Sequence, residues 1–302
     1  MQQIIGHSHF RITSRRFAFI ARVPIFACLT WGLFSCDHLD DPVLEVLSAC
    51  DASEAPEFTA LTSGVQNILV EDFTAHQCGN CPPAGLELKA LEEEYPGRVV
   101  PLSIHAGELA NTNEQFPIDW RCDEGNQFWD DIASNLNPVG RVNRLPEESA
   151  FLSVAQWSEE VEALIDNPAV AGLQLEVDYD DISGQATIHA HVTWFFGLEG
   201  IARLALLIAE NNIVAPQLWY PQANPPGPGF IENFNHEHLL RGSVTGAKGL
   251  VVADSPNAGD AEQFCYAFDW NDNWDANHSE VIAILTRDNG SVIQVLSAHV
   301  AE

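Results

Sequence analysis

Two cysteines with two residues between them, in Cys78-Gly79-Asn80-Cys81, have the spacing in this sequence that most clearly suggests chemistry. A short apolar run before them predicts a buried strand at 66–74, because it is rich in β-branched and aromatic side chains. Good helix formers follow, up to Pro96-Gly97. At a helix start the first thiol lies beside free N–H groups and the positive end of the dipole, which favour the thiolate. The second thiol can then resolve a mixed disulfide.

Two other interpretations of this cysteine pair remain open. The pair can form a purely structural disulfide that joins the strand to the helix. It can also supply half of a zinc site, but the sequence has no second C-x-x-C pair and no H-x-x-x-H pair at zinc-finger spacing. Zinc is therefore the least favoured of the three interpretations.

The elements that must position these cysteines follow from the pattern of apolar residues. A second strand is predicted at 98–105, a short helix around 126–133 and another helix at 153–166. From Ala171 onward the apolar residues alternate with a period of two, and turn signals such as Asp288-Asn289-Gly290 separate the runs. Short alternating strands of this kind are typical of an antiparallel β-sandwich.

The chain is therefore predicted to combine an α/β domain with an all-β domain. The α/β domain is expected at 63–168 and the β-sandwich at 169–302. Within the second domain, residues 220–242 (YPQANPPGPGFIENFNHEHLLRG) are predicted to form a long Pro/Gly-rich loop, of the kind that carries function or wraps a surface.

Residues 1–35 have the composition of an export signal. Four arginines accompany an apolar stretch, Val23 to Phe34, which is too short to span a bilayer as a permanent helix. The stretch ends in Leu33-Phe34-Ser35-Cys36, which resembles a bacterial lipobox, in which diacylglycerol is attached to the thiol of Cys36. A plain secretory signal with an incidental cysteine is the alternative. Residues 36–62 are acidic and turn-rich, which predicts a tether.

The chain is strongly acidic, with 43 Asp and Glu residues against 13 Lys and Arg, a formal net charge of −30. A nucleic-acid-binding protein needs a cationic surface to displace counterions, so this class of partner is excluded. Acidic residues soon after Cys36 resemble the surface-export signal of Bacteroidota lipoproteins. We therefore expect a lipid anchor in the outer membrane, with the cell-surface side favoured over the periplasmic side.

The remaining cysteines are odd in number. If residues 1–35 are removed and Cys36 carries lipid, the cysteines outside the C-x-x-C pair are Cys50, Cys122 and Cys265. At least one of them is expected to be a free thiol or the partner of another chain. The sequence does not define which of them pair.

A second cluster of chemically capable residues lies in the predicted loop, at Asn235-His236-Glu237-His238 and Arg241. In a strand-like segment His236 and His238 would project to one side and could hold a metal together with a carboxylate. We favour a different interpretation, in which His236, His238 and Arg241 form hydrogen bonds at the domain interface or cap the cysteine site.

A third cluster has the spacing of calcium ligands. Oxygen-bearing side chains occur at positions 1, 3, 5, 7, 9 and 12 of a twelve-residue stretch, the EF-hand pattern. Trp274 stands where that loop needs glycine, and the flanks are predicted strands, so the segment is not an EF-hand. An ordinary acidic turn is the favoured interpretation, and no cofactor is expected. Calcium in a β-loop is the alternative, with the ligands Asp269, Asn271, Asn273, Asp275 and Glu280.

The first half of the mature sequence is similar to thioredoxin along ILVEDFTAHQCGNCPPAGLELKALEEEYPGRVVPLSI. This resemblance implies a thioredoxin-like fold in which Cys78 is the nucleophile, Cys81 the resolving thiol and Pro138 the proline against which a substrate docks. The sequence departs from the pattern at Gln77, where an aromatic residue is usual, and at Gly79-Asn80. The buried acid of the reductases has no evident counterpart.

A narrower resemblance covers roughly residues 65–300. The blocks EDFTAHQCGNCP, SIHAG, NPVGRVNR, LLIAENNIVAPQ and HEHLLRG occur in the order found in the Omp-twenty-eight-related family of outer-membrane lipoproteins from Bacteroidota. The resemblance implies a thioredoxin-like domain, an immunoglobulin-like β-domain and residence in the outer membrane. It does not imply a settled activity.

These observations predict an outer-membrane lipoprotein that serves as a binding or accessory protein of the cell envelope, built on a thioredoxin-like scaffold. Its expected partners are the membrane, through the lipid anchor, and other proteins of the outer membrane. The alternative is an envelope thiol–disulfide oxidoreductase that uses the CGNC pair.

Overall fold

The computed structural model describes residues 50, 56–132 and 134–301 of the chain. The predicted signal, Cys36 and the first part of the tether lie outside the described residues. All described residues belong to one compact unit, Leu44–Glu302. Within the described ranges, no helix is both long and apolar enough to cross a membrane.

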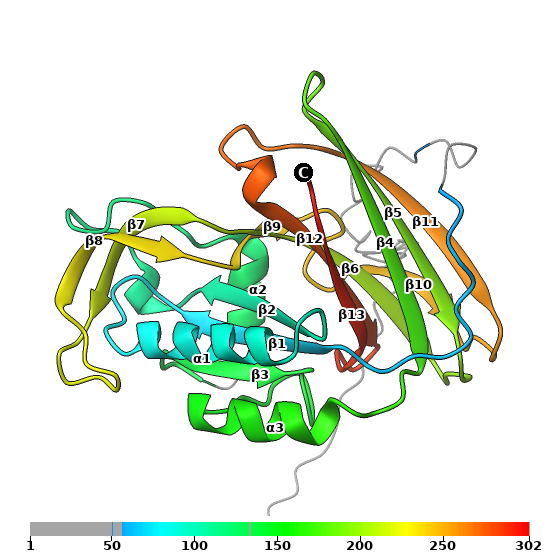
Figure 1. Ribbon diagram of the computed structural model, residues 1–302, viewed down its shortest axis with the longest axis horizontal. Helices are drawn as coiled ribbons and strands as arrows, with labels where there is room; N and C mark the ends of the chain where they lie inside the picture. Colours follow the sequence, from blue (N-terminus) through cyan, green and yellow to red (C-terminus); the bar gives the residue numbers. More distant parts are fainter. Residues whose placement is uncertain (1–49, 51–55, 133, 302) are drawn as a thin grey trace, which may run out of the picture. The chain divides into compact units, whose positions relative to one another are not determined.

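Strand β1 (Ile68–Thr74), helix α1 (Cys81–Glu94) and strand β2 (Val99–His105) form a parallel βαβ unit, close to the predicted bounds (Figure 1). The helix begins at Cys81 because two prolines follow, at positions that need no N–H partner. Its apolar face, with Leu88 and Leu91, packs against Ile68 and Val70 of β1. Strand β3 (Val139–Val142) adds to β1 in antiparallel fashion.

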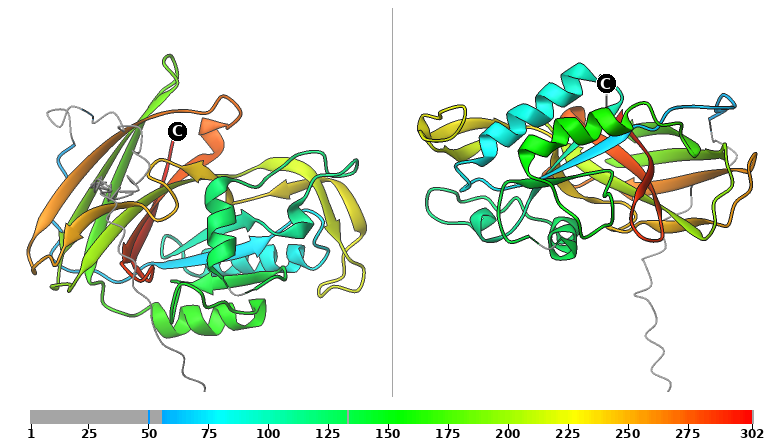
Figure 2. Two further views of the ribbon diagram at one scale, coloured as in Figure 1. Left: turned by 180° about the vertical axis from the view of Figure 1, so that it is seen from behind. Right: turned by 90° about the horizontal axis from the view of Figure 1, so that it is seen from below.

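Helices cover both faces of these strands. Helix α3 (Trp157–Leu164) packs beside α1 on one face, where Trp157 is fully buried (Figure 2). Helix α2 (Asp123–Asp131) contributes Phe128 to the core on the other face. The short 3₁₀ helices η2 (Glu108–Ala110), η3 (Val154–Gln156) and η4 (Ala276–His278) lie in the connections.

The βαβ unit is continuous with the C-terminal strands in one mixed sheet. The sheet order is β13-β12-β6-β9-β2-β1-β3, and β10 (Leu250–Asp254) also pairs with β6. The joint is narrow, since β2 meets β9 in parallel at the single register pair Ser103↔Leu239. The C-terminal members are β6 (Ile201–Glu210), β9 (Leu239–Ser243), β12 (Ser279–Arg287) and β13 (Val292–His299).

A second, three-stranded sheet packs against the C-terminal part of the large sheet. It has the order β11-β5-β4, with β11 at Ala261–Asp269, β5 at Gln185–Trp194 and β4 at Ala171–Asp180. The core between the sheets takes Leu204 and Leu206 of β6, whereas Ala205 and Leu207 face the α2 side. Strand β6 is thus buried on both faces, which explains its almost unbroken apolar sequence. The fold is mostly β, with several sheets.

The prediction of a long loop at 220–242 is wrong in part. Residues 229–236 form β8 (Gly229–His236), which pairs with β7 (Ile213–Trp219), and residues 239–243 form β9. Only residues 220–228, which contain the prolines and glycines between β7 and β8, form a loop as predicted. The physical reason is that a run of Pro and Gly residues is as compatible with the turn of a β-hairpin as with a long loop.

A buried ion cluster fixes β1 to the segment after β3. Glu71 is fully buried and lies 2.8 Å from both Arg141 and Arg144. Burial by itself would raise the pKa of Glu71, but the two guanidinium groups lower it below its ordinary value. Both arginines also lie over the ring of Phe128.

The three cysteines of undefined pairing are now placed. Cys50 forms a disulfide with Cys265 of β11, 215 residues away in sequence. Cys122 is unpaired within the described part of the chain, half-buried at the start of α2, and burial raises the pKa of its thiol to about 12.

Candidate functional site

The C-x-x-C pair is a disulfide, Cys78–Cys81, between the end of β1 and the start of α1. The loop is held locally, since the amide of Cys78 donates to Ala75 and that of Cys81 donates to the carbonyl of Cys78. Both side chains are almost inaccessible, with exposed fractions of 3% for Cys78 and 2% for Cys81. Among the described residues, no group of three or more His, Cys, Asp or Glu side chains is arranged to hold a metal.

The β7–β8 hairpin lies directly on the cysteine loop. The amide of Leu218 donates to the carbonyl of His76 (2.9 Å), and that of Tyr220 donates to the carbonyl of Gly79 (2.8 Å). The ring of Tyr220 packs so closely that a Cβ atom on Gly79 would lie 2.4 Å from it. Glycine between the two cysteines is therefore required by this contact.

Asp72 is a buried carboxyl group on β1 that the sequence motifs did not single out. It is 1% exposed, and its Oδ1 atom has no hydrogen-bond partner among the described residues. Burial raises its pKa to about 8. A signal for this position was present in the strand, because Ile68 and Val70 face α1 and the alternation of β1 places Asp72 on the same face.

Three histidines lie close to one another near the ends of β1, β2 and β8. The ring of His105, at the end of β2, lies 5.9 Å from that of His76 and 5.5 Å from that of His236, between centroids. Burial and the neighbouring imidazoles lower the pKa of His236 to about 4 and hold that of His105 well below its usual range. His105 Nδ1 and His236 Nε2 have no hydrogen-bond partner among the described residues.

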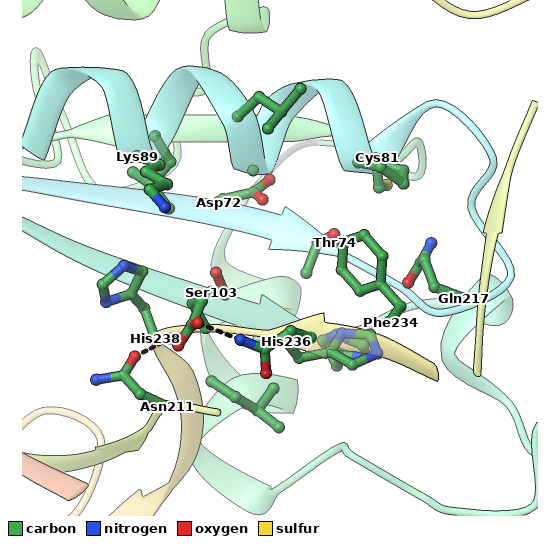
Figure 3. A pocket seen from close by; sticks show the side chains of 18 of the residues that line it. Asp72, Thr74, Cys81, Lys89, Ser103, Asn211, Gln217, Phe234, His236 and His238 are labelled. Carbon is green, nitrogen blue, oxygen red and sulfur yellow. Dashed lines mark hydrogen bonds between the residues drawn. The ribbon is translucent and has the colours of Figure 1, made fainter. Parts of the chain in front are cut away.

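A cavity of about 590 Å³ is lined by Asp72, His105 and His236, but not by His76. It lies between α1, the ends of β1 and β2, and the β7–β8 hairpin (Figure 3). In the picture, Asp72 lies between its strand and α1, which carries Cys81 and Lys89. Cys81 is among the lining residues and Cys78 is not. The cavity is also lined by the aromatic residues Trp219 and Phe234 and by the hydroxyl-bearing residues Ser103 and Thr74.

The three residues singled out at 236–241 separate in space. His236 enters the histidine cluster, whereas His238 has a positive φ of 56° and its Nε2 lies 3.3 Å from a carboxylate oxygen of Glu92. Arg241 pairs with Glu210 and lies over the ring of Trp120. The strand ends at His236, so the two histidines do not project side by side as a metal pair would.

The stretch with calcium-like spacing follows β11. Asp269 accepts a hydrogen bond from Gln185, Asn271 accepts one from the amide of Asn273, and Asp275 caps η4 through the amide of Asn277. Glu280 lies on β12, 3.5 Å from the ring of His299. These oxygens are thus engaged in local turns and pairs.

Pro138 lies immediately before β3, after a cis peptide bond. The preceding side chain, Asn137, donates to the carbonyls of Phe73 and Thr74. Pro138 is therefore held next to the end of β1, from which the cysteine loop departs.

Comparisons with known proteins address the family and the fold. HBP35 of Porphyromonas gingivalis is similar in structure, with a TM-score of 0.58 and 18% identity, over 79% of this chain and 77% of that one. A crystal structure from Agrobacterium tumefaciens matches 79% of this chain and 96% of its own, with a TM-score of 0.46 and 12% identity. No curated protein sequence matches the chain.

The family model of outer membrane protein Omp28 matches residues 125–302, from α2 to the C-terminal strands. The match begins after the cysteine pair and includes β3, the β7–β8 hairpin and both C-terminal sheets. It confirms the resemblance that the sequence motifs indicated. The match covers more than half of the residues of this chain, and the chain therefore belongs to the Omp28 family of outer membrane proteins.

Proposed function

We propose that this outer membrane protein is a lipoprotein that carries out thiol–disulfide exchange with the Cys78–Cys81 pair of a thioredoxin-like domain. The observation that carries the proposal is Asp72, a buried carboxyl group that lines the same cavity as Cys81 and whose Oδ1 has no hydrogen-bond partner among the described residues. A group with a pKa of about 8 can both give a proton to a sulfur and take it back near neutral pH. A purely structural disulfide has no need of such a group.

The exchange has two balanced steps. In the order implied by the thioredoxin resemblance, the Cys78 thiolate attacks one sulfur of a substrate disulfide, and the other sulfur leaves as a thiolate. The Cys81 thiolate then attacks the sulfur of Cys78, which closes the protein disulfide and expels the second substrate thiolate. Asp72 takes the proton of Cys81 in this direction and returns it when the pair is reduced. By the same resemblance, Pro138 would face a substrate that docks on the cysteine loop.

A redox titration tests the proposal. The full chain in mild detergent is equilibrated with thiol–disulfide buffers, and its thiols are trapped by alkylation, with Cys78→Ser and Cys81→Ser as controls. We expect a reversible couple between about −120 and −270 mV, with a mixed disulfide in the single-cysteine variants. A pair that stays oxidised below about −300 mV until the chain unfolds would refute the proposal.

A second function is favoured by one observation, the covered disulfide. Both cysteines are nearly inaccessible, and the ring of Tyr220 covers Gly79 between them. This is expected if the thioredoxin-like and immunoglobulin-like domains serve a binding or accessory protein and the pair is structural. Native-state reduction by a water-soluble phosphine discriminates between the two. If exchange is the function, Tyr220→Ala speeds reduction and Val214→Ala, on the same hairpin, does not. Equal resistance in both variants would favour the binding protein.

The proposed anchor is the thiol of Cys36, with residues 36–62 as the tether. Its substitution in Cys36→Ala should move the protein from the membrane fraction to the soluble fraction of the cell.

A further inference from the structure

The cysteine loop is closed to an extended protein substrate. Proteins that bind an extended strand do so through free backbone groups at an edge. In this loop the carbonyls of His76 and Gly79 accept from the hairpin, and the side-chain amide of Gln217 donates to the carbonyl of Cys78 (3.2 Å). The hairpin of the same chain thus occupies the position that a substrate strand would take.

The cavity offers a different approach to the pair. Cys81 lines it, and its volume of about 590 Å³ lies within the range of small-molecule sites. Three of the residues that line it, Asp72, His105 and His236, each have a buried polar atom (Oδ1, Nδ1 and Nε2, respectively) without a partner in the described residues. Buried polar atoms of this kind cost free energy unless something that enters the cavity satisfies them.

The charge of the cavity selects against anions. Burial keeps Asp72 largely protonated and both imidazoles neutral near pH 7, so these three residues present no cation to an entering ligand. At the rim, the carboxylates of Glu92 and Glu237 outnumber Lys89, whose ammonium group lies 3.8 Å from Glu93. The chain as a whole carries a formal charge of −30, which repels anions at longer range.

Resting on the proposed exchange function but reversing the order of the two cysteines that the thioredoxin resemblance implies, we infer that the substrate is a small disulfide, or its thiol, without negative charge. It enters this cavity and reacts first at Cys81, the cysteine that lines it. The Cys81 thiolate attacks a dialkyl disulfide, so that a Cys81–substrate bond forms and one alkyl thiolate leaves. The Cys78 thiolate then attacks the sulfur of Cys81, the protein disulfide closes and the second alkyl thiolate leaves. The protein dithiol is oxidised, the small disulfide is reduced, and the two cysteine protons pass to the two products.

The test compares three small disulfides of similar size and different charge. The reduced full chain is mixed with cystamine (cationic), 2-hydroxyethyl disulfide (neutral) or dithiodiglycolate (anionic), and each rate is divided by the rate of that disulfide with a free small thiol. We expect cystamine to exceed dithiodiglycolate by about tenfold or more, with a gap that narrows in high salt. Insulin, a protein disulfide, should react more slowly than any of the three.

A blocking variant locates the reaction in the cavity. Gly85 of α1 lines the cavity, and a Cβ there would meet nothing within 4 Å, so Gly85→Trp places a ring in the cavity without a backbone clash. We expect this variant to lose about tenfold or more of the rate with cystamine. Ala90→Trp, on an exposed turn of the same helix outside the cavity, should keep the rate.

The outcomes separate this inference from the proposed function. If the couple titrates reversibly but Gly85→Trp reacts at the wild-type rate, or Cys81→Ser forms the mixed disulfide faster than Cys78→Ser, the exchange function stands and the inference is overturned. A charge order that reverses, or insulin as the fastest substrate, overturns it as well. If the couple does not titrate in the folded chain, both fail.

Discussion

Replacing Asp72 by asparagine should make the stability of the protein depend less on pH between about 4 and about 8. Asparagine has the shape of the protonated carboxyl group but cannot ionise. The pKa of Asp72 is about 8 in the folded chain, above the ordinary value of 3.8. A raised carboxyl pKa means that the folded state binds the proton more tightly than the unfolded state does, so wild-type stability falls as pH rises from about 4 to about 8.

The magnitude follows from the width of this window. Each pH unit between the two pKa values removes about 1.4 kcal/mol from the free energy of unfolding. The ionisation of Asp72 therefore costs about 4 kcal/mol at pH 7 and about 6 kcal/mol when it is complete. Asp72→Asn avoids this cost, so its stability relative to wild type should rise by about 3 kcal/mol between pH 5 and pH 7.

Urea denaturation of the oxidised chain at pH 5, 6, 7 and 8 measures this difference. The comparison between pH values cancels any constant effect of the amide group. Asp178→Asn, at an exposed position of β4, is the matched control and should differ from wild type by the same amount at every pH. A difference between Asp72→Asn and wild type that does not change with pH would refute the assignment of Asp72 as a buried neutral acid.

Two further predictions concern stability. Glu71→Gln leaves Arg141 and Arg144 buried without the carboxylate that pairs with them, so it should lower the free energy of unfolding by about 3–5 kcal/mol. The control Glu176→Gln, at an exposed position of β4, should change it little. A loss below about 1 kcal/mol in urea denaturation would contradict the role of the ion cluster. Cys265→Ser opens the link to Cys50 across 215 residues and should cost about 5 kcal/mol through the entropy of the unfolded chain, measured under non-reducing conditions. Unchanged stability would show that the link does not constrain the unfolded state.

The βαβ unit could be predicted because its signals are local. The apolar run before the cysteines, the prolines after them and Pro96-Gly97 mark the bounds of β1, α1 and β2 to within a few residues. The cysteine site was equally visible, since it depends on two residues three apart.

What the sequence could not show depends on partners far away in the chain. Tyr220 covers Gly79 across 141 positions, and the prolines that follow it in no way indicate that contact. The histidine cluster joins His76, His105 and His236 from three elements that pack together only in the folded chain. Asp72 is a different case. Its burial follows from the alternation of side chains along β1, but the types of the residues beside it did not indicate that burial.

The single joint between β2 and β9 has a consequence for biosynthesis. Leu239, which completes the sheet beside Ser103, is made 136 residues later. Until it has left the ribosome and reached the same compartment, the edge of β2 near Ser103 stays without its neighbour, and so does the amide of Ser103 that donates to His238. The early strands therefore need the last third of the polypeptide to complete their sheet. A nascent chain that stalls before residue 239 has an unpaired strand edge, which the export machinery must keep from pairing with other chains.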